Sequence, residues 1–271
     1  AADASSPSQV KLYTRDSNAD TYWSYSLSAT SADADNDRVV FSGITSFSQF
    51  AVCRRLAPNQ GAGNLLKFDG ELDYVEGTGI SHTLKAFTIE AWVLHNSLPQ
   101  EVQRYVSISP EAAVIRFDGS TYGGSDELHF YISDTDGNVH SLRTNDVLQT
   151  GVWQHIAGTY DGNDMKLYCN GELVNSASPG KELLSPSGSF LFSHVTETLD
   201  GRLDEVRLWN YARNIDDIRS DMYRTLPNTT DRGMVAYWQL DEGTGLLVSE
   251  LAGEHTGTLH HMDNSNWDAS T

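Results

Sequence analysis

Short runs in which apolar and polar residues alternate make up most of the chain. In the clearest run, residues 87–93, every second residue from Phe87 to Val93 is apolar. A period of two places these side chains on one face of a strand. One face of such a strand packs on a core, and the chain is therefore predicted to be rich in β-strands.

Tight-turn sequences join several of these runs. Asp136-Gly137, Asp161-Gly162 and Asn170-Gly171 each separate two apolar runs. Asn-Gly and Asp-Gly favour hairpins because the turn residues need positive φ. Strands joined by such turns at short spacing predict an antiparallel two-sheet sandwich and argue against βαβ units.

One short helix is predicted on the surface of this sandwich. Asn214 is a good N-cap, and Asp216 and Asp217 are acidic residues suited to the first turn. Ile218 and Met222 continue an apolar stripe at helical spacing.

The first 56 residues differ from the rest. Short strand candidates alternate there with polar stretches, and we expect a small β-strand segment or the end of a preceding β domain. Residues 57–64 are predicted to be a linker because glycine, proline and asparagine gather there. The larger domain is predicted to span residues 65–271.

The net charge of −19 and the pI near 4.6 limit the possible partners. Phosphate backbones and anionic lipids repel so acidic a chain, and we expect neither nucleic-acid binding nor membrane insertion. Surplus carboxylates do suit calcium. The amino terminus has no signal peptide, so the chain is expected to be a processed or excised piece.

Cys53 and Cys169 are the only cysteines. Two cysteines exclude a disulfide scaffold and a cysteine-built zinc site. They leave two alternatives open. Cys169 occupies an apolar position of its predicted strand, which favours a buried thiol, whereas an oxidising compartment would allow a Cys53–Cys169 disulfide.

Six segments in order carry a resemblance to a known family. They are LLKFDGELDYVEG from Leu65, FTIEAWV from Phe87, GVWQHIAGTYDG from Gly151, MKLYCNGELV from Met165, GRLDEVRLWNYARNIDDI from Gly201 and GMVAYWQLDEGTG from Gly233. Together they resemble the laminin G-like jelly rolls of the concanavalin A-like lectin superfamily, to which pentraxins belong. An earlier segment is similar to stretches of modular secreted bacterial surface proteins; it is RVVFSGITSFSQFAV, from Arg38.

This resemblance implies a jelly roll over residues 65–271 that is secreted or displayed on the cell surface. Such domains bind polysaccharides, glycoconjugates or surface proteins, frequently with calcium. Similarity to the pentraxin calcium region implies metal ligands at Asp126, Glu197 and Asp200. Tyr105, Tyr122 and Tyr131 lie near the implied rim or concave sheet and are the candidate ligand contacts. Five tryptophans lie within the family segments and are predicted to pack in the sheets or core: Trp92, Trp153, Trp209, Trp238 and Trp267.

An enzymatic alternative rests on Glu71, Asp73 and Glu76, which match the E-x-D-x-x-E pattern of laminarinase-like glucanases. A retaining mechanism needs the two glutamates about 5–5.5 Å apart. Their odd separation puts them on opposite faces of a regular strand, and only a bulge would bring them together. Because lectin-like members share the FDG-x-D-Y-V string, we interpret this segment as a structural strand.

The sequence therefore predicts no catalytic residues and a non-catalytic extracellular binding module that is carbohydrate-binding or adhesive. Calcium assistance is part of this hypothesis. A structural spacer or protein-interaction domain of a large surface protein is the alternative, and a glycoside hydrolase is the further one.

Overall fold

The computed structural model describes residues 63–269 except 81–83, 110, 121–126, 181–182, 227–232 and 252–253. Before residue 63 it describes residues 10–15, 24–28, 31–33, 38–40, 42 and 49–54. The chain divides into two compact units, residues 1–56 and 57–271. Each unit is described by itself.

The first unit contains two small antiparallel sheets. One has the order β2-β1-β5 and the other pairs β3 with β4. The strands are β1 (Val10–Arg15), β2 (Ser24–Ser28), β3 (Ser31–Asp33), β4 (Arg38–Val40) and β5 (Gln49–Arg54).

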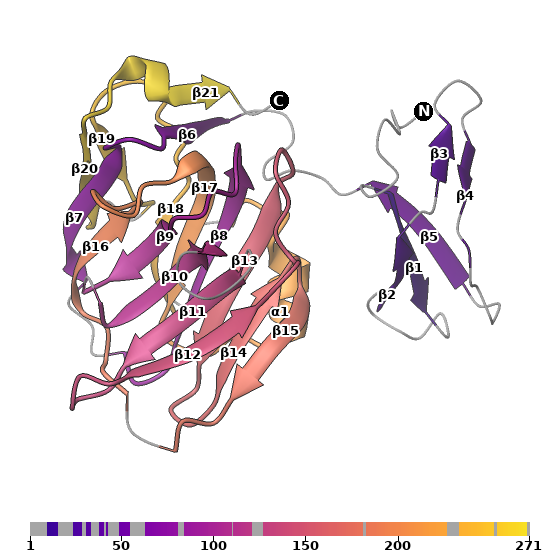
Figure 1. Ribbon diagram of the computed structural model, residues 1–271, viewed down its shortest axis with the longest axis horizontal. Coiled ribbons are helices and arrows are strands. Elements are labelled where there is room, and N and C mark those ends of the chain that lie inside the picture. The colour runs from indigo at the N-terminus through magenta and orange to yellow at the C-terminus, as the bar shows by residue number, and fades with distance from the viewer. Residues whose placement is uncertain are drawn as a thin grey trace. The chain divides into compact units, whose positions relative to one another are not determined.

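The second unit is a sandwich of two eight-stranded antiparallel sheets, as the sequence predicts (Figure 1). The β9 sheet has the order β12-β11-β10-β9-β16-β7-β20-β19. Its strands are β7 (Tyr74–Ile80), β9 (Gln103–Ile108), β10 (Ala113–Asp118), β11 (Glu127–Ser133), β12 (Val139–Thr144), β16 (Gly188–Phe192), β19 (Leu247–Ser249) and β20 (Thr256–His260).

The second sheet, called the β8 sheet, has the order β15-β14-β13-β8-β17-β6-β21, and β18 pairs with β17. Its strands are β6 (Asn64–Asp69), β8 (Phe87–His95), β13 (Gln154–Tyr160), β14 (Met165–Cys169), β15 (Glu172–Ala177), β17 (Asp200–Trp209), β18 (Met234–Trp238) and β21 (Trp267–Ala269). A 3-10 turn, η4 (Asn264–Asn266), precedes β21.

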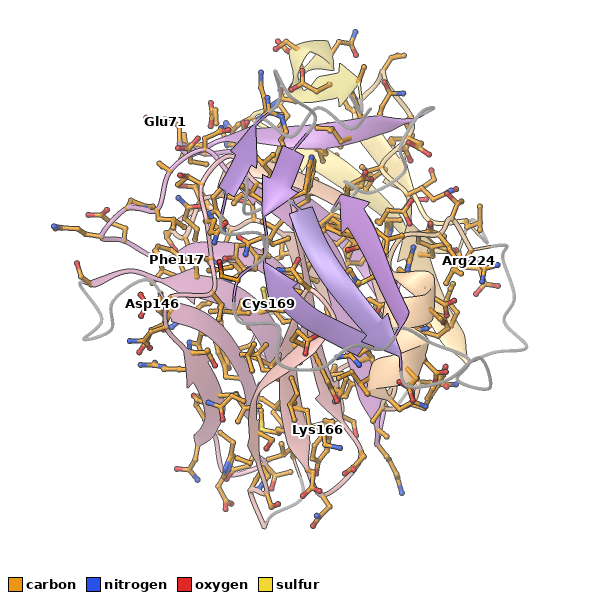
Figure 2. All side chains as sticks on the ribbon, turned by 90° about the vertical axis from the view of Figure 1, so that its right-hand side faces the viewer. Glu71, Phe117, Asp146, Lys166, Cys169 and Arg224 are labelled. Carbon is orange, nitrogen blue, oxygen red and sulfur yellow. The ribbon has the colours of Figure 1, made fainter. Side chains whose placement is uncertain are left out.

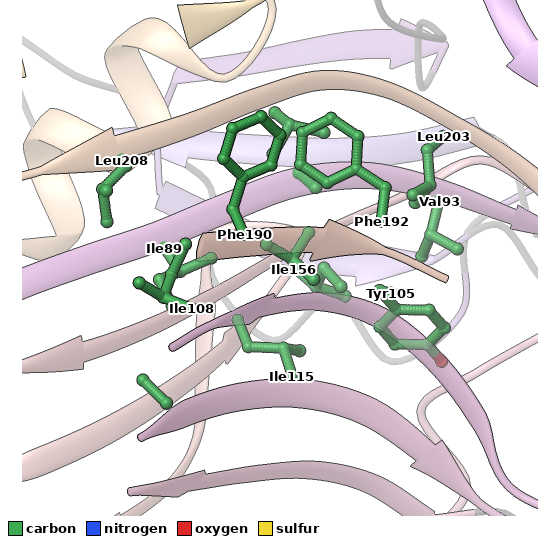
Figure 3. Close-up of a cluster of buried hydrophobic side chains, with 14 of the residues drawn as sticks. Ile89, Val93, Tyr105, Ile108, Ile115, Ile156, Phe190, Phe192, Leu203 and Leu208 are labelled. Atoms are coloured by element: carbon green, nitrogen blue, oxygen red, sulfur yellow. The ribbon is translucent and has the colours of Figure 1, made fainter. Parts of the chain in front are cut away.

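The hydrophobic core lies between these two sheets. Ile89 and Leu203 of the β8 sheet face Ile115 and Phe190 of the β9 sheet (Figure 3). The predicted inward face of β8 is confirmed, since every second residue from Phe87 to Val93 belongs to this core. Four of the five family tryptophans are buried as predicted, and Trp153 is half-buried.

The predicted hairpins are also present. Asn170 and Gly171 join β14 to β15 with φ values of 55° and 74°, which is the positive-φ pair that an Asn-Gly turn supplies. Gly137 between β11 and β12 and Gly162 between β13 and β14 have φ values of 83° and 99°.

The predicted helix is α1 (Ile215–Asp221), and it covers part of the outer face of the β8 sheet. Asn214 caps it by accepting a hydrogen bond from the Asp217 backbone N–H. Ile218 packs on Ala157 and Tyr168 of the sheet. Trp92 Nε1 donates to the Met222 carbonyl oxygen at 2.7 Å. The segment around α1 therefore buries the second face of β8 as well as the first.

Candidate binding face

Five side chains form a row across the outer face of the β9 sheet: His129, Arg116, Arg104, Tyr74 and His260. We call them the outer row. His129 pairs with Arg116, and Arg116 with Arg104, on adjacent strands. Across β16, Tyr74 pairs directly with His260. At least one chain neighbour of each residue belongs to the core, so these side chains point outward.

A bulge in β9 decides which side chains reach this face. Ile115 of β10 pairs with Val106, whereas the next residue, Arg116, pairs with Arg104. The extra residue is Tyr105, which turns into the core (Figure 3), where its ring contacts that of His95. Tyr105 is fully buried, and its hydroxyl lies 2.8 Å from His95 Nε2. This predicted ligand contact therefore has no surface to offer a ligand in this structure.

Glu197 joins two arginines of the outer row. Its Oε2 accepts from Arg104 Nε at 2.6 Å, and its Oε1 accepts from Arg116 Nη1 at 3.0 Å. Burial disfavours the charge on Arg104, but Glu197, Tyr131 and Glu111 together outweigh burial and raise the pKa of Arg104. Each of the two arginines holds one oxygen of Glu197.

A second set of ion pairs surrounds Asp118. Its Oδ1 lies 2.6 Å from Arg116 Nε, and its Oδ2 lies 2.7 Å from His129 Nδ1 and 3.3 Å from Arg143 Nη2. Burial raises the pKa of Asp118, but His129 and Arg116 outweigh it and the pKa is lowered. Burial lowers the pKa of His129, although Asp118 opposes this shift.

Tyr131, the other described tyrosine of the prediction, borders the row. Its ring lies 5.2 Å from the Arg116 guanidinium carbon, and its hydroxyl donates to Glu111 Oε2. The ring itself is buried, whereas the Glu111 side chain is 60 % exposed and also bonds Arg104. Glu111 therefore presents this network to solvent, a role that sequence reasoning missed.

Tyr74 and His260 form a stacked pair at the other end of the row. Their ring centroids lie 4.5 Å apart with an interplanar angle of 6°, and both side chains are half-buried. The exposed Glu76 follows on the same face of β7. Sequence reasoning missed this pair because Tyr74 and His260 lie 186 positions apart, on two strands whose pairing no local pattern reveals.

The predicted metal ligands have separate partners. Glu197 is held by two arginines, as described above. Asp200 accepts hydrogen bonds from Asn96 Nδ2 at 2.9 Å and from Ser97 Oγ. Asp126 and Tyr122 lie outside the described residues. Within the described part of the chain, no group of three His, Cys, Asp or Glu side chains could hold a metal ion. Glu197 and Asp200 thus have protein partners in this structure, and calcium binding stays a prediction.

The glucanase-like segment has a structural use in this fold. Asp73 is buried at the turn between β6 and β7, where its Oδ2 accepts from the Asp69 N–H at 3.1 Å and from Asn266 Nδ2 at 2.8 Å. Burial and the neighbouring Asp69 raise the pKa of Asp73. Glu71 is exposed in the same turn, at the periphery of the sheets (Figure 2), and Glu76 is exposed on β7. Asp73 therefore ties the turn to the segment that precedes β21.

Cys169 is buried, and its sulfur lies 3.1 Å from Asn170 Nδ2 and 3.8 Å from Gln154 Nε2. The side chain of Cys53 lies outside the described residues, so the disulfide stays a prediction.

Comparisons with known proteins agree with the fold. A laminin G family model, described as "Concanavalin A-like lectin/glucanases superfamily", matches residues 69–219. Mouse (Mus musculus) pappalysin-1 is 32% identical over 116 residues, which are 38% of this chain and 7% of that protein. The chain therefore spans only a small part of this relative.

Two solved structures are similar in fold. A Bacteroides ovatus protein described as carbohydrate-binding is 19% identical with a TM-score of 0.62, over 83% of this chain and 64% of that one. A heptameric SAP-like pentraxin from Limulus polyphemus is 14% identical with a TM-score of 0.51, over 74% of this chain and 97% of that one. No helix among the described residues is long and apolar enough to cross a membrane.

Proposed function

Because the chain belongs to the concanavalin A-like lectin/glucanase superfamily, we propose that it is a non-catalytic, extracellular glycan-binding module. Its ligand lies along the outer row of the β9 sheet. One observation carries this proposal: a single row combines a half-exposed aromatic pair with a network of charged hydrogen-bonding side chains.

The two ends of the row supply different chemistry. Tyr74 and His260 offer an apolar ring face, on which the apolar face of a sugar can stack. Arg116, Glu197 and Glu111 offer donors and acceptors that hydroxyl groups can use, and their side chains are 12, 18 and 60 % exposed. Arg104 on β9 and Tyr74 on β7 are two strand spacings apart, so about 10 Å separates the nearest charged side chain of the row from the aromatic pair.

The assignment as non-catalytic is supported by Asp73. In the glucanase pattern this residue would tune two glutamates, but here its carboxylate holds a turn together. The carbohydrate-binding description of the similar Bacteroides ovatus protein also supports a binding role. Secretion or display on a cell surface is part of the proposal, because soluble polysaccharides and glycoconjugates are met there.

Affinity electrophoresis in gels that contain single polysaccharides tests the proposal, followed by calorimetry with the best ligand. Tyr74→Ala should weaken binding about tenfold because it removes the stacking face. Tyr74→Phe keeps the ring and should bind like the wild type. Asp216→Asn, on α1 at the other sheet, is a remote control. Absence of binding to plant, algal and animal glycans would instead favour the spacer alternative.

Calcium assistance is a separate part of the proposal and rests on the resemblance of the Asp126 region to pentraxins. We propose to titrate calcium into protein treated with a chelator while following the melting temperature and glycan affinity. A rise in both would support a calcium-assisted site. If the melting temperature and glycan affinity do not change, the outer row would bind glycan without calcium.

A further inference from the structure

We infer that the outer row selects uncharged glycans and rejects acidic ones; this rests on the proposed function and concerns its ligand class. The inference comes from how the charges on this face are paired. A sugar carboxylate or sulfate is usually recognised by a guanidinium that has donors to spare.

The three arginines that the structure describes in this network already have carboxylate partners. Arg104 pairs with Glu111 and Glu197 at 2.9 and 2.6 Å. Arg116 pairs with Asp118 and Glu197 at 2.6 and 3.0 Å. Arg143 lies 3.3 Å from Asp118 and 3.7 Å from Glu127.

Carboxylates outnumber these arginines. Four of them enter the network, namely Glu111, Asp118, Glu127 and Glu197, and three arginines oppose them. Burial lowers the pKa of His129 and so disfavours a positive charge on its ring. The exposed Glu76, on the same face of β7, adds a further negative charge beside the aromatic pair.

Exposure decides which of these groups a ligand meets. Glu111 is 60 % exposed, whereas Arg104 is 3 % and Arg116 12 % exposed. Arg143, on the neighbouring edge strand β12, is 40 % exposed. On β9 and β10 an approaching sugar therefore meets carboxylate oxygens first. Those oxygens accept hydrogen bonds from hydroxyls, which every neutral glycan carries. An anionic group would meet like charge instead, and it could reach Arg104 or Arg116 only by displacing a partly buried carboxylate. Arg143 is the more accessible guanidinium, and Asp118 and Glu127 flank it at 3.3 and 3.7 Å.

A glycan array of matched pairs tests this inference, with each neutral oligosaccharide printed beside its sialylated, sulfated or uronic-acid form. Binding is measured at 50 mM and 500 mM sodium chloride. We expect the neutral member of each bound pair to bind at least about fivefold more strongly at low salt. The difference should shrink at high salt, because screening weakens repulsion but not a steric mismatch.

Two variants separate charge from structure. Glu76→Gln and Glu111→Gln each remove one exposed negative charge and should raise the acidic-to-neutral binding ratio about fivefold at low salt. Asp216→Asn removes the same charge from the opposite sheet and should leave the ratio unchanged. Because Glu76 is exposed, Glu76→Gln should fold normally, and the test can still be read if Glu111→Gln misfolds.

The possible results distinguish the inference about charge from the proposed glycan binding. A wild-type preference for acidic members, or a ratio that neither variant moves, would overturn the inference and leave glycan binding standing. Absence of binding to both members of every pair would overturn the inference and the proposed function together.

Discussion

Glu90 is a buried carboxylate between the β8 sheet and the segment that carries α1. Its Oε1 accepts from Arg213 Nη1 at 2.8 Å and from Trp209 Nε1 at 3.0 Å. Burial raises the pKa of Glu90, but Arg213, His155 and Arg207 together outweigh it and the pKa is lowered. Glu90 is therefore charged at neutral pH and anchors the chain before α1 to the sheet.

Glu90→Gln should destabilise the protein by about 3–5 kcal/mol, because it leaves Arg213 buried without this carboxylate. Urea unfolding at pH 7 measures the change. Glu76→Gln is the matched control, an exposed glutamate whose substitution should change the free energy of unfolding by less than about 0.5 kcal/mol. Equal stability of the two variants would show that Asp221, 2.5 Å from Arg213, suffices as its partner.

Asp204 is a buried carboxylate whose pKa is raised, whereas that of Glu90 is lowered. Its Oδ1 accepts from the Glu205 N–H, and its Oδ2 is a buried atom for which the described residues supply no hydrogen-bond partner. Burial, Glu205 and Asp241 raise the pKa of Asp204 well above 3.8. The folded state therefore holds a proton that the unfolded state releases, so stability from this group is complete below pH 3.8 and falls as the pH rises.

Asp204→Asn should therefore stabilise the protein at pH 7, by about 1–3 kcal/mol, because the amide is neutral in both states and folding no longer requires a proton to be taken up. The gain should shrink between pH 7 and pH 4, and urea unfolding at both values measures it. Asp216→Asn should show no such pH dependence. A loss of stability at pH 7 would mean that the Asp204 carboxylate has a cationic partner in solution.

At the scale of elements, the turn between β14 and β15 packs against α1. A Cβ on Gly171 would lie 2.8 Å from Arg219 Cγ, and the Gly171 carbonyl accepts from Arg219 Nε at 2.7 Å. Gly137 has a similar positive φ, but nothing lies within 4 Å of its Cβ position. The two turns therefore differ in steric contact and share the same backbone requirement.

Gly137→Ala should cost about 1–2 kcal/mol, which is the penalty for a side chain at positive φ. Gly171→Ala should cost about 1–3 kcal/mol more, because Arg219 must also move. Thermal unfolding of the two variants measures the difference. Equal destabilisation by the two variants would show that α1 can shift away from the turn without loss of stability.

The elements also show how far sequence predicts structure. Local chemistry was sufficient for the Asn170-Gly171 turn and the Asn214 cap, because neighbouring residues alone determine both. Local chemistry did not predict that Glu90 and Trp92 of β8 are buried. Alternation predicts an outward face there, whereas a segment more than 100 residues away covers it.

At the scale of the whole molecule, the outer row depends on strand pairing that the sequence does not encode locally. The family resemblance predicts the jelly roll and places Tyr131 near its rim or concave sheet, and in the structure Tyr131 borders the outer row. It could not place Tyr105, because a one-residue bulge in β9 reverses the side to which that ring points. It also missed Tyr74 with His260, because β7 and β20 meet only once the sandwich has closed.

The second unit should fold without the first. All sixteen strands of its two sheets lie between Asn64 and Ala269, and its core contains only residues from Leu66 to Trp267. A protein of residues 57–271 should therefore melt within about 4 °C of the full chain, a shift equivalent to about 1 kcal/mol or less for a domain of this size.

Calorimetry of this protein and of the full chain, with and without the best glycan, measures both stability and binding. Glycan affinity should be unchanged, because every residue of the outer row lies beyond residue 73. A larger fall in melting temperature would show that the first unit contributes to the stability of the second. Normal melting with lost affinity would place part of the ligand contact in residues 1–56, and the outer row would then be only one part of the binding surface.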